Sequence, residues 1–172
     1  MIMRGGQPLL LPAKPVFIWF TLGLALLLDM LPLGRQPWRP DLLALVLVFW
    51  TIHQPLRVGV GAAFVFGLFM DVHRAGLLGQ HALVYTALSY LAIMVHRRIL
   101  WFPVGSQALQ VLPLLMAAHV LELFVRLISG YGFPAWSFWL SPFLQALLWP
   151  VVSLLLLMPQ HRAHDPDENR PL

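Results

Sequence analysis

The chain contains no cysteine, and only 10% of its 172 residues are charged. The absence of cysteine excludes disulfides, thiolate metal sites and cysteine nucleophiles. Soluble domains carry about 25% charged residues, so the low charge content excludes an ordinary soluble domain. What is present is apolar: 59% of the residues are hydrophobic, and the mean hydropathy is +0.77. This composition predicts an integral membrane protein.

Enzyme motifs are also missing. The sequence has no G-x-S-x-G, no glycine-rich phosphate loop and no paired-aspartate motif. The histidines His73, His81 and His119 lack the i, i+4 pairing with a nearby carboxylate that is typical of a zinc site. We therefore predict no enzyme, no cofactor and no metal site. An intramembrane enzyme built from distant residues is the weaker alternative.

Six apolar segments follow one another, separated by proline, glycine and charged residues. They cover residues 15–33, 41–54, 57–72, 77–97, 105–129 and 138–158. The second would reach only about 21 Å as a helix, less than the roughly 30 Å hydrocarbon core. Segments two and three are therefore compatible with a hairpin that does not cross fully. The sequence predicts an all-α membrane domain over residues 1–158, with six transmembrane helices, and a polar cytoplasmic tail over 159–172.

Basic residues indicate the orientation of these segments. With both termini in the cytoplasm, the inner flanks hold Arg4, Lys14, Arg57, Arg97, Arg98, Arg162 and Arg170, and the outer flanks only Arg35, Arg39 and Arg74. We predict a multi-pass protein with both termini cytoplasmic. Because the positive charges lie in short flanking loops, they indicate anionic lipid headgroups rather than nucleic acid as their partner.

The stretch 57–89 carries two stripes with a spacing of four residues. The first is small and ends in a carboxylate: Gly59, Ala63, Gly67 and Asp71. The second is polar: His81, Tyr85 and Ser89. Both stripes suit helices that pack closely, and we expect His81 and Tyr85 to form hydrogen bonds across a helix interface. The small stripe either packs within the chain or receives a helix from another protein.

A few charges fall within the predicted spans, all in the outer half: Asp29, Glu122 and Arg126. Glu122 and Arg126 are four residues apart, which favours an ion pair within the helix. These charges fix helix packing through salt bridges, or they belong to an ion path or substrate pocket. A proton path needs a second polar relay in the inner half, where only His53, His96 and Gln145 are candidates.

The motifs resemble those of the rod shape-determining protein MreD family of bacteria. Arg39-Pro40-Asp41-Leu42-Leu43 opens the second segment, and a G-L-x-x-D-x-x-x-x-G-x-x-G pattern contains Gly67, Asp71, Gly76 and Gly79. The pattern continues through His81 and Ala82. Size and segment order match over nearly the whole chain, whereas residues from Gly105 onward match in hydropathy alone.

This resemblance implies a non-enzymatic scaffold of the cell-elongation machinery in the bacterial inner membrane. Its partners would be MreC and, through it, MreB, RodA and a class B penicillin-binding protein. We expect the helix face with Gly59, Ala63 and Gly67 to bind the transmembrane helix of MreC. The resemblance also implies a fold similar to the substrate-binding subunits of energy-coupling-factor transporters. The alternative function is therefore that of a vitamin-type binding subunit of a membrane transporter.

Overall fold

The computed structural model describes residues 13–32, 38–75 and 77–160, and in these ranges the chain is helical without strands. The elements are α1 (Pro15–Met30), α2 (Leu42–His53), α3 (Val60–Arg74), α4 (Gln80–Leu100), α5 (Val104–Ile128), the 3₁₀-helix η1 (Trp136–Trp139), α6 (Leu140–Leu157) and the 3₁₀-helix η2 (Met158–Gln160). The all-α prediction is confirmed, and each predicted segment overlaps one α-helix. Most of the predicted tail, together with Arg35 and Gly76, lies outside the described residues.

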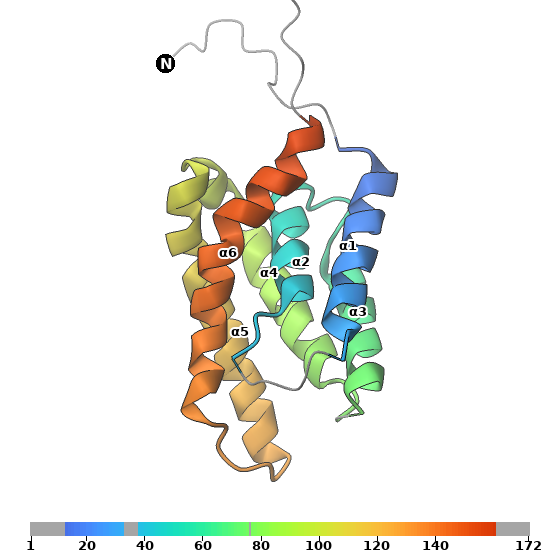
Figure 1. Ribbon diagram of the computed structural model, residues 1–172, viewed down its shortest axis with the longest axis vertical. Helices are drawn as coiled ribbons and strands as arrows, with labels where there is room; N and C mark the ends of the chain where they lie inside the picture. The colour runs from blue at the N-terminus through green and yellow to red at the C-terminus, as the bar shows by residue number, and fades with distance from the viewer. Residues whose placement is uncertain (1–12, 33–37, 76, 161–172) are drawn as a thin grey trace, which may run out of the picture.

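The helices form an up-and-down bundle, in which α1 begins and α6 ends at the same end (Figure 1). Within the described ranges, three helical stretches are long and apolar enough to cross a membrane: α4, α5 and η1 with α6. The shorter helices α1 and α2 are apolar as well. The protein is therefore a membrane protein, and three of the six predicted crossings are supported by length and composition.

The short helix α2 lies at the centre of the bundle, where it packs against α1, α4 and α6. Every residue from Leu43 to Ile52 is buried. The start of α2 lies beside the end of α1: the Leu43 N–H of α2 donates to Asp29 Oδ2 of α1 at 2.7 Å. The loop that follows α2 returns to the start of α1, where Arg57 Nη1 donates to the Ala13 carbonyl at 2.7 Å. Helix α2 therefore lies alongside α1, and the surrounding helices bury its short apolar length.

Helices α3 and α4 approach each other very closely at Gly67. A Cβ atom placed on Gly67 would lie 2.3 Å from the Ala82 Cα atom, closer than any real side chain allows. Ala63 and Asp71, on the same face of α3, are also buried. Small residues permit such close backbone approach in membrane helices. Gly67 and Asp71 of the small stripe thus pack against α4 of the same chain, whereas Gly59 lies beside Pro55.

Candidate functional site

Polar side chains from all six α-helices gather at one end of the bundle. Near this end α1, α3 and α5 finish, and α2, α4 and α6 begin. The polar residues are Asp29, Asp41, Asp71, Arg74, His81, Tyr85, His119, Glu122 and Gln145, and we call them the polar cluster. Charged groups inside a membrane domain are costly unless they are paired, so their partners decide what the cluster can do.

Asp71 is the most completely bonded member of the polar cluster. It is 1% exposed, and its carboxylate accepts hydrogen bonds from the backbone N–H groups of Gly79, His81 and Ala82. These N–H groups belong to the first turn of α4, where a helix has no backbone acceptors of its own. The His81 ring adds a contact of 2.7 Å to Asp71 Oδ1. A carboxylate on α3 therefore caps the N-terminus of α4 and neutralises its dipole.

The neighbouring Arg74 determines which ring nitrogen of His81 carries a proton. Arg74 Nη1 lies 2.8 Å from His81 Nε2, and an arginine can only donate. His81 Nε2 is therefore the acceptor, and Nδ1 carries the proton that is donated to Asp71. The prediction that His81 forms a hydrogen bond across a helix interface is confirmed.

Asp41 links α2 to α4. Its Oδ1 atom accepts the Ala44 N–H at 2.8 Å and so caps α2, while its Oδ2 atom accepts the Tyr85 hydroxyl at 2.5 Å. The predicted interhelical bond of Tyr85 is thus confirmed. The positive charge of Arg74 lies near Asp41 and stabilises its carboxylate.

Glu122 and Arg126 do not form the predicted ion pair in the described structure. Arg126 instead donates from Nε to the Gly132 carbonyl at 3.2 Å, and its guanidinium lies 6.0 Å from the centre of the Tyr131 ring. The loop after α5 offers Arg126 a carbonyl acceptor and an aromatic ring in place of Glu122. The prediction was wrong because spacing within one helix does not reveal these tertiary partners.

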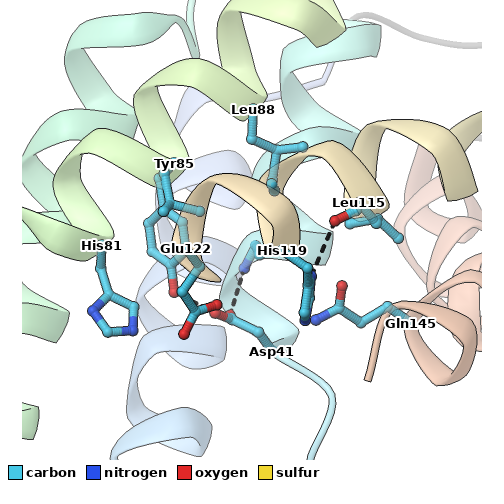
Figure 2. Close-up of a pocket in the computed structure, with 11 residues that line it drawn as sticks. Asp41, His81, Tyr85, Leu88, Leu115, His119, Glu122 and Gln145 are labelled. Carbon is cyan, nitrogen blue, oxygen red and sulfur yellow. Dashed lines mark hydrogen bonds between the residues drawn. The ribbon is translucent and has the colours of Figure 1, made fainter. Parts of the chain in front are cut away.

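A small cavity lies among α2, α4, α5 and α6 within the polar cluster (Figure 2). Its volume is about 20 Å³, and its polar lining comprises Asp41, His81, Tyr85, His119, Glu122 and Gln145. Gln145 was expected as a relay candidate in the other half of the membrane. That prediction was wrong, because Gln145 lies in the second turn of α6, beside His119 and Glu122.

The predicted site residues thus separate into two groups. Ala63, Gly67, Asp71, His81 and Tyr85 are buried between helices, whereas Gly59 and Gly79 are half-buried. Asp41 was missed as a site residue, although an aspartate directly before an apolar run is a recognised helix-start signal. In the part of the chain that the structure describes, no group of histidine and acidic residues could hold a metal ion.

Comparisons with known proteins agree with this architecture. The model of the family "rod shape-determining protein MreD" matches residues 13–159. The rod shape-determining protein MreD of Haemophilus influenzae is 31% identical over 145 residues, which cover 82% of this chain and 87% of that protein. No solved structure matches the chain, so the predicted likeness to energy-coupling-factor transporter subunits stays a prediction. The chain therefore belongs to the MreD family of rod shape-determining proteins.

Proposed function

We propose that this protein is a non-enzymatic scaffold of the rod-shape machinery in the bacterial inner membrane. It binds the transmembrane helix of MreC and, through MreC, connects MreB with RodA and a class B penicillin-binding protein. Membership of a shape-determining family supports the cell-shape role. The partners and the cytoplasmic position of both termini are part of the proposal.

The interior and the exterior of the bundle differ in whether their side chains already have partners, and this difference is the main support for the proposal. Inside, the carboxylates of Asp71 and Asp41 are already bonded to groups of the same chain. Outside, large apolar side chains are exposed along the helices, among them Phe69 on α3, Met94 on α4 and Phe124 on α5. A membrane protein of this form acts on its surroundings through its helix faces.

The alternative, a vitamin-binding subunit, requires a different interior. Pockets for small organic ligands have volumes of about 300–1,000 Å³. The cavity in the polar cluster has about 20 Å³, room for about one water molecule. This volume favours the scaffold over the transporter subunit.

A groove on the exterior suits a partner helix better than the buried stripe of α3 does. It has a volume of about 440 Å³, lies on α4 between α3 and α5, and is lined by Phe64, Leu77, Leu78, Gly79, Gln80, Leu83, Thr86 and Val125. We place the MreC helix in this groove, where Gly79 contacts it directly. Ala63, Gly67 and Asp71 then act indirectly, since they hold α3 and α4 at the separation that forms the groove.

Site-specific photocrosslinking tests this proposal. A photoreactive residue at Leu83, in the groove, should crosslink to MreC in membranes. The same residue at Leu147, which is 73% exposed on α6, should not. Both positions are exposed to the membrane, so they form a matched pair.

The outcomes separate the parts of the proposal. Crosslinking at Leu147 alone would move the contact to α6 and leave the scaffold function standing. If MreC did not co-purify with the unmodified chain, the scaffold function itself would be contradicted. Tight binding of a vitamin by the purified chain would restore the transporter alternative.

A further inference from the structure

The end of α5 and the loop after it project from the bundle at the end where the polar cluster lies. Figure 1 shows them extending beyond the ends of α1 and α3 at the bottom of the view. The loop covers residues 129–135 and leads into η1. Tyr131 is exposed, and Phe133 and Trp136 are 81% and 90% exposed. We call these three aromatic residues, together with Arg126, the aromatic tip.

A Schellman motif ends α5 and gives the aromatic tip its shape. Gly130 has a left-handed φ of 80°, and its N–H donates to the Leu127 carbonyl at 3.1 Å. The Tyr131 N–H donates to the Arg126 carbonyl at 3.1 Å, so the chain turns sharply directly after the helix. The Arg126 side chain closes this turn, because its Nε donates to the Gly132 carbonyl and its guanidinium lies near the Tyr131 ring. Contacts within the chain therefore hold Arg126 and Tyr131 together.

Arg126 carries the one charge in this part of the chain. From residue 123 to residue 160 the sequence has no other charged residue. The Nε atom of Arg126 is bonded, but its two Nη atoms donate to no residue that the structure describes. Arginine has no acceptor atoms, so these Nη groups fit only an acceptor, and an anionic one best. The aromatic tip thus combines exposed rings with a cationic fork of N–H donors.

We propose that the aromatic tip lies in the lipid headgroup layer and that Arg126 binds a phospholipid phosphate there. Tryptophan and tyrosine side chains concentrate at membrane interfaces, where their rings contact lipid and their polar atoms contact headgroups. The planar guanidinium matches the oxygens of a phosphate in a bidentate contact. The aromatic tip joins two helical stretches that are long and apolar enough to span a membrane, α5 and η1 with α6. The lipid around these helices therefore continues onto the tip.

This position of the aromatic tip also sets the depth of the cavity in the polar cluster. Glu122 lines that cavity and lies about one turn before Arg126 in α5. Four residues of α-helix span about 6 Å, so Glu122 lies about that much closer to the bilayer centre than Arg126 does. The headgroup layer then separates the cavity from bulk water. The lipid contact is distinct from the partner groove, whose lining contains none of the four residues of the tip.

A depth measurement with spin labels tests the position of the aromatic tip. The chain has no cysteine, so Phe133→Cys takes a nitroxide label at one position only. The labelled full chain is placed in vesicles of phosphatidylethanolamine and phosphatidylglycerol. Relaxation of the label by oxygen, which concentrates in lipid, is then compared with relaxation by a water-soluble nickel chelate. The control is Leu147→Cys, an exposed position within α6.

We expect the label at residue 133 to give the oxygen-to-nickel ratio of a nitroxide attached to a lipid headgroup. The label at residue 147 should give a higher ratio, as in the apolar core. A ratio at residue 133 equal to that of free label in water would overturn the proposal and favour a protein partner for the tip. Equal ratios at both positions would also overturn it, since the tip would then lie in the core.

Solid-state NMR in the same vesicles tests the phosphate contact. Isotope-labelled arginine Cζ atoms lose intensity when lipid phosphorus nuclei lie close to them. The signal that disappears in Arg126→Lys belongs to Arg126, and we expect it to show this loss. The control is Arg39→Lys, since both Nη atoms of Arg39 donate to carbonyls of the same chain, and its signal should show a smaller loss. No loss for Arg126, or an equal loss for both arginines, would overturn the phosphate contact.

Discussion

Asp71 and Gln145 are two buried polar side chains at the same end of the bundle, but they differ in how many hydrogen bonds they accept. Asp71 receives three backbone N–H groups and a histidine from α4. The Oε1 atom of Gln145 receives no donor from the described residues. The first arrangement is complete within the chain and favours one rigid geometry of α3 and α4. The second leaves one buried oxygen on α6 without a hydrogen bond from the neighbouring helices in the described residues.

We expect the largest loss of folding stability when the fully bonded carboxylate of Asp71 is removed. Asp71→Ala leaves the N–H groups of Gly79, His81 and Ala82 without their acceptor. Each unsatisfied group costs about 1–3 kcal/mol, so we expect a loss of about 3–5 kcal/mol of folding stability. Thermal unfolding in detergent measures the loss. The control is His73→Ala, two residues away on the exposed side of α3, which should leave the Tm unchanged. Equal Tm values for both variants would contradict the capping role.

The contact between α3 and α4 provides the next largest effect. Gly67→Ala places a methyl group 2.3 Å from the Ala82 Cα atom, a backbone atom that cannot move alone. We expect a loss of about 2–3 kcal/mol, typical of overpacking. Gly61→Ala, also in α3, has no atom within 4 Å of the new Cβ. It should raise stability by about 0.5–1 kcal/mol through helix propensity. A similar change in both variants would show that the close contact is not rigid.

The smallest effect is expected for Tyr85, which lies between the two regions because it lines the cavity and bonds Asp41. Tyr85→Phe removes the hydrogen bond of 2.5 Å to Asp41 Oδ2 and leaves the ring in place. A hydrogen bond to a charged group contributes about 1.5–3 kcal/mol, and we expect a loss near the lower value, about 1.5 kcal/mol. Tyr90→Phe is the control, since Tyr90 is 52% exposed on the same helix. A larger loss for Tyr90→Phe would mean that the bond to Asp41 adds little stability.

The helices could be predicted from the sequence to within a few residues. Apolar runs end at proline, glycine and charged residues, and the helices begin and end near these residues. The partners of the polar groups could not be predicted. Tyr85 bonds Asp41, which is 44 positions away, and only the packing of α2 on α4 brings them together. The depth of Gln145 was misjudged for the same reason, because depth depends on where α6 begins.

The unequal lengths of the helices have a consequence for the surrounding lipid. Helices α1 and α3 lie side by side and have 16 and 15 residues, whereas α5 has 25. At 1.5 Å per residue, one flank is about 24 Å tall and the other about 37 Å. The short flank is lower than a bilayer core of about 30 Å and α5 exceeds it; bilayers accommodate short stretches by thinning, and long helices accommodate by tilting. We therefore expect the protein to act as a wedge that bends its annular lipids, and to gather where the bilayer already has uneven thickness.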